Sequence, residues 1–217
     1  MKRLSFVFLL VIGIALLSFS TNAAALVIIP KDDGSKKIPL SSWTKEAKAP
    51  LPDAVVDVYN STCPEAPSSL GCTTKDTTRH YSIWIAPVYN QASDERFKRI
   101  FYHELSHVFD GRYLTSSDRR LATSYLGYPS SVQWDGTGDT SGLFFASPQE
   151  WFAESGSFCY AGSAAKWPAY KYPYGYGQET LNVCQLMNTA ATRTPPPSRQ
   201  NYQKTIGANK RFTSAET

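Results

Sequence analysis

The sequence predicts a single α+β domain in which a small mixed sheet precedes a set of helices. Three short stretches rich in β-branched and aromatic residues lie within the first 90 residues, whereas helical spacing of apolar residues begins after residue 93. Strand patterns followed by helix patterns are typical of α+β domains. With 217 residues, the chain is long enough to bury one sizeable core.

The N-terminal segment, residues 1–23, has the pattern of a secretory signal peptide. Two basic residues precede an almost wholly apolar run at 4–17, and Ala23 is a small residue of the kind that signal peptidase accepts. The apolar run is shorter than the roughly 20 residues of a membrane span, and an uncleaved membrane anchor is the alternative. We therefore expect a secreted domain at residues 24–191.

Three stretches have the composition of strands, at residues 26–30, 54–59 and 80–89. The third is the clearest because β-branched and aromatic residues dominate it before Pro87. Between the second and third stretches, residues 63–78 are rich in Pro, Ser and Thr, and we expect a loop there.

A helix is predicted at residues 94–109. Ser93 is a favoured N-cap, and acidic residues follow it in the first turn. Gly111 offers a stop after the last periodic residue. Apolar residues recur at spacings of three and four, which gives the helix one apolar face: Phe97, Ile100, Phe101, Leu105 and Val108.

The second half of the chain predicts two further helices. Residues 116–139 are mixed and rich in Ser, Gly and Tyr, and no element is assigned to them. A helix is expected to begin at Ser147 and Pro148, because serine is a favoured cap and proline is favoured at the first helical position. A short helix is expected at 180–190, followed by a flexible Pro-rich tail at 192–217.

The four cysteines predict two disulfides, because an even count in an exported chain favours pairing. Three pairings are possible, and Cys63–Cys72 with Cys159–Cys184 is favoured because each closes a local loop. A cysteine-based zinc site is the alternative, but the chain lacks the C-x-x-C spacing typical of such sites.

The most informative motif is His103-Glu104-Leu105-Ser106-His107, which matches H-E-x-x-H and falls inside the first predicted helix. Residues four apart on a helix share a face, so both imidazoles can reach one metal ion. Glu104 lies one step around the helix and can serve as a general base beside the metal. The alternative is a structural histidine pair on a surface helix.

A catalytic zinc ion needs a third protein ligand. Glu150 is the preferred candidate, and Glu154, four residues later on the same helix face, can accept a hydrogen bond from a histidine ligand. Asp139 is a second candidate. The competing interpretation of Glu150 is a capping box with Ser147, in which the carboxylate only reaches back to the helix start.

HELSHVFD followed by EWFAE resembles the gluzincin metallopeptidases. Within them it is most similar to the branch of the anthrax lethal factor catalytic domain, the bacterial Pro-Pro endopeptidases and similar secreted fungal zincin-like proteins. The resemblance covers roughly residues 80–160. It implies a zincin-like fold in which His103, His107 and Glu150 bind zinc, Glu104 is the base and Glu154 supports the ligands. It also implies that the strand at 80–89 edges the substrate cleft.

The sequence departs from that branch at one place. The branch usually has a tyrosine several residues before the ligand glutamate, where it stabilises the oxyanion, and residues 142–146 contain none. By residue type alone, Tyr125, Tyr128 and the tyrosines within 170–176 are candidates for this role. Asp139 follows Gly-Thr-Gly, as in the aspartate motif of the aspzincins, although the expected Tyr-Gly after it is missing.

The sequence therefore predicts a secreted, monomeric zinc endopeptidase with one catalytic Zn²⁺ and protein or peptide substrates. The formal charge of +4 falls to +2 without the two basic residues of 1–23, which is too small to indicate binding to nucleic acid or an anionic membrane. Two alternatives remain: a zincin-like binding or effector protein with little or no turnover, and an aspzincin-like peptidase that uses Asp139 as the third ligand.

Overall fold

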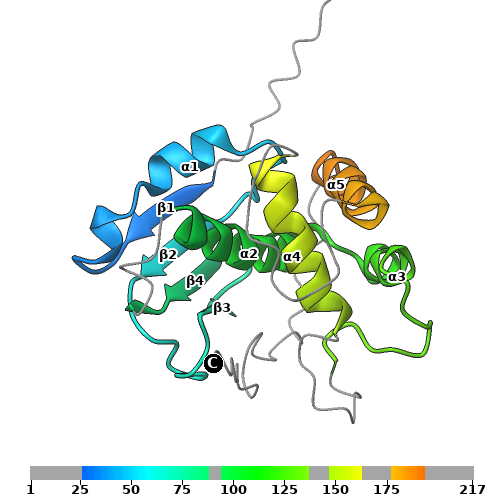
Figure 1. Cartoon of the computed structure of the whole chain (residues 1–217), viewed down its shortest axis with the longest axis horizontal. Helices are drawn as coiled ribbons and strands as arrows, with labels where there is room; N and C mark the ends of the chain where they lie inside the picture. The colour runs from blue at the N-terminus through cyan, green and yellow to red at the C-terminus, as the bar shows by residue number, and fades with distance from the viewer. Residues whose placement is uncertain (1–25, 88–93, 137–146, 163–176, 194–217) are drawn as a thin grey trace, which may run out of the picture.

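The computed structural model describes residues 26–87, 94–136, 147–162 and 177–193 (Figure 1). This part of the chain has the expected α+β class, with a small sheet and a set of helices. In chain order the elements are β1 (Val27–Pro30), a 3-10 turn (Ser35–Lys37), α1 (Leu40–Glu46), β2 (Val55–Tyr59), β3 (Gly71–Lys75), β4 (His80–Ile85), α2 (Asp94–Tyr113), α3 (Ser116–Tyr125), α4 (Pro148–Ala161) and α5 (Gln178–Ala191).

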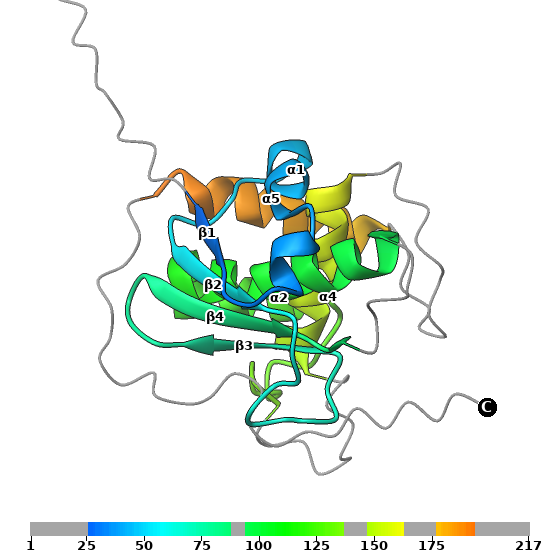
Figure 2. The ribbon, with the colours of Figure 1, turned by 90° about the vertical axis from the view of Figure 1, so that its left-hand side faces the viewer.

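The sheet is mixed, as predicted, with the strand order β1-β2-β4-β3. β1, β2 and β4 run parallel, and β3 runs antiparallel to β4. Side chains on one face of the sheet, including Val56, Val58 and Ile83, are fully buried. Figure 2 shows α2 and α4 behind the sheet, so the main core lies between the sheet and these helices.

The third predicted strand, which was expected to border the substrate cleft, is not an edge strand of the sheet. β4 lies inside the sheet, between β2 and β3, and β3 forms the edge. The expected loop at 63–78 thus contains a strand, which the Pro- and Ser-rich flanks conceal in the sequence. One side of its backbone is hydrogen-bonded to β4, a long-range contact that local composition does not encode.

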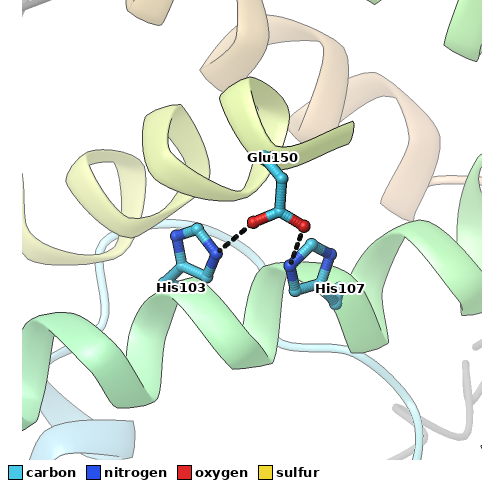
Figure 3. Close-up of side chains that lie close together, drawn as sticks. All are labelled: His103, His107 and Glu150. Atoms are coloured by element: carbon cyan, nitrogen blue, oxygen red, sulfur yellow. Dashed lines mark hydrogen bonds and ion pairs between the residues drawn. The ribbon is translucent and has the colours of Figure 1, made fainter. Parts of the chain in front are cut away.

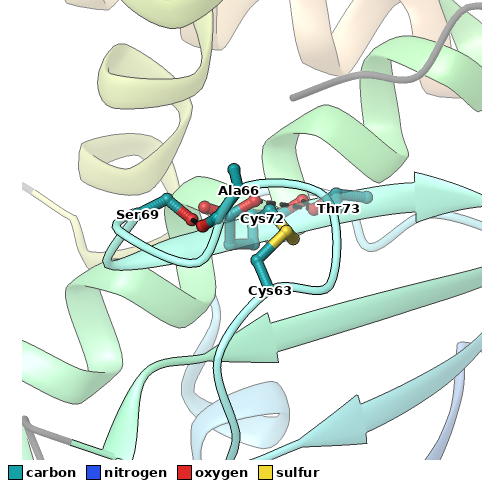
Figure 4. The surroundings of a disulfide bond; sticks show 6 residues. Cys63, Ala66, Ser69, Cys72 and Thr73 are labelled. Carbon is teal, nitrogen blue, oxygen red and sulfur yellow. Dashed lines mark hydrogen bonds between the residues drawn. A yellow bond between two sulfur atoms is a disulfide. The ribbon is translucent and has the colours of Figure 1, made fainter. Parts of the chain in front are cut away.

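Both predicted disulfides are confirmed. Cys63 is bonded to Cys72 of β3, and the bond is buried together with Ala66, a residue of the loop that it closes (Figure 4). Cys159 near the end of α4 is bonded to Cys184 of α5. Two disulfides fit a chain that folds in an oxidising compartment.

Helix α2 is longer than the sequence predicted, because Gly111 does not end it. A Cβ atom at Gly111 would lie 3.0 Å from the Oη atom of Tyr81, so the glycine lets the helix pass close to β4. The residue therefore serves packing between helix and sheet rather than termination.

Helices α1 and α3 were not predicted. α3 begins with a capping box in which the Thr115 hydroxyl accepts from the Asp118 N–H and the Asp118 carboxylate accepts from the Thr115 N–H. Its first turns are polar, so the apolar spacing that marks a helix is weak there. α1 is short, and the Tyr102 hydroxyl of α2 donates a hydrogen bond to the backbone oxygen of Trp43 within it.

Several sequence predictions fall outside the described residues. These are the signal peptide at 1–23, Asp139, the tyrosines within 170–176 and nearly all of the tail at 192–217. Among the residues that the structure does describe, no helix combines the length and apolar character needed to cross a membrane.

Candidate metal centre

Three predicted ligand residues meet between α2 and α4 (Figure 3). His103 and His107 project from the same face of α2, one turn apart, and Glu150 faces them from the first turn of α4. The Nε2 atom of His103 lies 3.1 Å from one carboxylate oxygen of Glu150, and the Nε2 atom of His107 lies 3.4 Å from the other. His107 and Glu150 are buried, and the side chain of His103 is 17% exposed.

The spacing of these three side chains suits a metal ion. Their ligand atoms all lie within 4.8 Å of one another. Tetrahedral ligands at about 2.0–2.1 Å from a zinc ion stand roughly 3.3 Å apart. The two nitrogen-to-oxygen separations, 3.1 and 3.4 Å, lie on either side of that value. The group can thus hold an ion after small side-chain movements.

Without a metal, the centre is an ion pair. Burial disfavours a charge on His107, but the Glu150 carboxylate outweighs burial and raises the pKa of His107 to about 9. Burial also disfavours ionisation of Glu150, and the two histidines, His107 foremost, hold the pKa of Glu150 at about 2. At neutral pH a metal ion therefore has to displace the proton of His107 in order to bind.

The start of α4 shows that the Glu150 carboxylate does not take part in a capping box. Ser147 caps the helix, and its hydroxyl accepts from the Glu150 N–H at 3.3 Å, while Pro148 takes the first helical position. The Glu150 carboxylate does not complete a capping box. It turns to the histidines of α2, so the backbone of this residue serves the cap and its side chain serves the centre.

Asp110, three residues after His107, ties the start of α4 to α2. Its buried carboxylate accepts hydrogen bonds from Arg119 at 2.7 Å, Trp134 at 3.0 Å and Gln149 at 3.1 Å. Because Gln149 directly precedes Glu150, the Asp110 carboxylate helps to set the position of Glu150 at the start of α4. The sequence motif included Asp110, but only the fold reveals these partners.

Close packing of α2 on α4 brings the ligands within reach of each other. A Cβ atom at Gly156 would lie 2.3 Å from the Oγ atom of Ser106 on α2. Ser106, between the two histidines in sequence, is fully buried. Ser106 on α2 and Gly156 on α4 are small enough for the two helices to pack closely, which lets the Glu150 carboxylate reach both histidines.

Glu154 lies behind His103, as expected for a supporting residue. Its Oε2 atom is 3.4 Å from the Nδ1 atom of His103, and its Oε1 atom pairs with Arg99. Arg99 was not singled out from the sequence, although it precedes His103 by four residues and so shares its helix face. Arg99, Glu154 and His103 form a chain of contacts that fixes the imidazole from the side away from Glu150.

Glu104, the predicted base, points towards the sheet rather than to α4. The residue is 5% exposed, and its carboxylate accepts a hydrogen bond from the Thr73 hydroxyl of β3 at 2.7 Å. Burial raises the pKa of Glu104 above its usual range, against the opposing effect of the two histidines. Neither Thr73 nor β3 was expected here from the sequence.

The remaining predicted residues contribute less to the described centre. Tyr125 is partly buried and packs against the core. Tyr113, at the end of α2, accepts a hydrogen bond from the Asp53 N–H. In comparisons with known proteins, no family model, curated protein or solved structure matches the chain.

Proposed function

We propose that the chain is a secreted, monomeric, zinc-dependent endopeptidase that hydrolyses protein or peptide substrates. The observation that carries the proposal is the meeting of His103, His107 and Glu150 from two helices. Two histidines and one carboxylate leave a fourth position open, which is typical of catalytic rather than structural zinc sites. Imidazole and carboxylate ligands in this number favour zinc over magnesium or calcium.

Each residue has a distinct role in this proposal. Bound zinc supplies a water of lowered pKa and polarises the scissile carbonyl. His103, His107 and Glu150 hold the ion, and Glu154 orients the ring of His103. Glu104 accepts a proton from the attacking water and donates it to the leaving amine. Burial raises the pKa of Glu104 above its usual range, which favours the protonated form that donates to the leaving amine.

Strand β3 is the proposed platform for the substrate. Its edge away from β4 carries no other strand among the described residues, and β3 packs beside α2 close to Glu104. An extended peptide can add to such an edge through backbone hydrogen bonds, which bind a main chain whatever its side chains. An endopeptidase gains substrate alignment from this mode of binding.

The test measures zinc content and cleavage of a mixed peptide library by the chain without residues 1–23, beside Glu104→Gln. We expect about one zinc in both proteins and cleavage only by the unsubstituted chain, because the amide cannot accept the proton. Cleavage by Glu104→Gln at an undiminished rate would contradict the role of the base. Cleavage sites in the library then define the specificity.

The two alternatives predict other results. A zincin-like binding protein, which the lack of a tyrosine in residues 142–146 favours, would retain zinc and cut no peptide even with Glu104 intact. An aspzincin-like peptidase would lose zinc in Asp139→Ala. Our proposal expects zinc to be lost in Glu150→Ala and retained in Asp139→Ala, as measured by atomic absorption.

A further inference from the structure

The carboxylate of Glu104 is enclosed by two residues of the edge strand. Its Oε2 atom accepts a hydrogen bond of 2.7 Å from the Thr73 hydroxyl, which also lies 3.1 Å from the Glu104 backbone oxygen. Its Oε1 atom lies against Gly71, where an added Cβ atom would stand only 2.6 Å away. Both carboxylate oxygens thus face β3. Oε2 accepts a hydrogen bond from Thr73, and Oε1 occupies the space that a side chain at position 71 would fill.

The pleat of β3 explains why these two residues face the helix. Gly71 pairs with Ile85 and Thr73 with Ile83, and the side chains of both isoleucines are buried in the core beside α2. Successive residues of a strand point to opposite faces, so Cys72 points away, where its disulfide to Cys63 anchors it. The strand thereby presents a glycine and a hydroxyl to Glu104, and nothing larger.

Glycine at position 71 matters for space rather than for backbone freedom. The same added Cβ atom would lie 2.9 Å from the Cγ2 atom of Ile100, one turn before Glu104 on α2. Those two contacts are shorter than van der Waals distances, so any side chain at 71 would push the carboxylate or the helix away. The absence of a side chain at position 71 therefore leaves the space that the Glu104 carboxylate occupies.

A glutamate side chain has several rotatable bonds, and a base has to stand within hydrogen-bond reach of the proton that it takes. Burial alone does not choose among rotamers, whereas a directional donor such as a hydroxyl does. We propose that Thr73 is a positioning residue that, with Gly71, holds Glu104 in the orientation needed for proton transfer. The inference rests on the proposed peptidase function, in which Glu104 is the base.

The experiment compares Thr73→Val, which keeps the shape and removes the hydroxyl, with Thr73→Ser, which keeps the hydroxyl. Thr123→Val is the matched control, because Thr123 is another buried threonine whose hydroxyl donates to a backbone oxygen on α3. Zinc content, kcat, KM and a crystal structure are determined for each variant. The structures report the orientation of Glu104 independently of turnover.

We expect Thr73→Val to bind about one zinc with KM nearly unchanged, while kcat falls about 10- to 100-fold, since a misplacement of about 1 Å has effects of this size. The Glu104 carboxylate should leave its place in the Thr73→Val structure. Thr73→Ser should recover kcat to within about threefold, and Thr123→Val should match the unsubstituted chain.

The inference is overturned if Thr73→Val keeps both kcat and the position of the Glu104 carboxylate, or if it loses zinc together with activity. If the unsubstituted chain binds zinc but cuts no peptide, the proposed function fails, and the structures still decide the inference. In that case, displacement of Glu104 in Thr73→Val but not in Thr73→Ser would support positioning. An unmoved carboxylate in both variants would refute it.

Discussion

At the scale of single residues, the candidate metal-binding residues were predictable from the sequence, whereas the residues that contact and orient them were not. His103, His107 and Glu150 were predictable because each belongs to a short pattern with fixed helical spacing. Thr73 and Arg99 were not predictable, because their roles depend on contacts with Glu104 and Glu154 that only the fold creates. Local spacing therefore predicts ligands better than it predicts the groups that orient them.

Glu154→Gln tests the support of His103. The amide retains the shape but loses the charge that pairs with Arg99 and faces the Nδ1 atom of His103. We expect zinc affinity to fall about 10- to 100-fold, the usual effect of removing an outer hydrogen-bond partner of a ligand. Competition with a chelating dye measures it, and Glu179→Gln on the exposed first turn of α5 is the control. Equal affinities in both variants would contradict this role.

The charge state of the metal-free centre predicts a pH dependence of stability. The pKa of His107 is about 9 in the folded chain and 6.5 ordinarily, so its ion pair contributes fully below pH 6.5. That contribution is lost as pH rises through about 9. The raised pKa of Glu104 acts in the same direction, because its ionisation disfavours the folded state.

We therefore expect the melting temperature of the chain in EDTA to decrease between pH 6.5 and 9. The zinc-loaded chain should show a weaker dependence, because a bound ion takes the place of the His107 proton. Calorimetry at steps of half a pH unit measures both curves, and His107→Asn in EDTA should flatten the decrease. A flat curve for the unsubstituted chain in EDTA would show that the ion pair adds nothing to stability.

At the scale of elements, α2, α4 and α5 were expected from the sequence, whereas β3, α1 and α3 were missed. The apolar periodicity of α2 and the start signal of α4 are local properties. β3 owes its existence to pairing with β4 and to packing beside Glu104, and neither contact can be inferred from residues 71–75 alone. The error at Gly111 has the same origin, since its neighbour Tyr81 is distant in sequence.

Gly156→Ala tests the close packing of α2 on α4. The new methyl group would meet Ser106 at well below contact distance, so the helices have to separate. We expect a loss of about 1–3 kcal/mol in the free energy of unfolding, as for other overpacked cores, even though alanine favours a helix. Urea unfolding measures the loss. Adding Ser106→Ala, which removes the nearest atom, should recover part of it; full stability of Gly156→Ala alone would contradict the argument.

At the scale of the whole molecule, the two disulfides secure the two parts of the fold that meet at the centre. Cys63–Cys72 fastens the edge strand beside Glu104, and Cys159–Cys184 fastens α4, which carries Glu150, to α5. Neither disulfide belongs to the candidate metal centre, but one anchors β3 beside Glu104 and the other anchors α4, which carries Glu150. Pairing was predictable from the sequence because each bond closes a local loop.

Removing each disulfide should destabilise the chain to a different extent. The bonds span 9 and 25 residues. From loop entropy we expect losses of roughly 2–3 kcal/mol for a double serine variant at Cys63 and Cys72, and roughly 3–4 kcal/mol at Cys159 and Cys184. Chemical denaturation of the two variants measures these values. A larger loss for the shorter loop would indicate that strand attachment, and not chain entropy, dominates.

The division of the ligands between two helices also has a consequence for timing. Helix α2 carries two of them and helix α4 the third, so neither helix grips an ion fully until the two have packed together. If the chain binds zinc as proposed, uptake of the ion is a late step of folding, and its release accompanies the separation of α2 from α4. A zinc-sensitive dye present during unfolding would report the rate at which α2 and α4 separate.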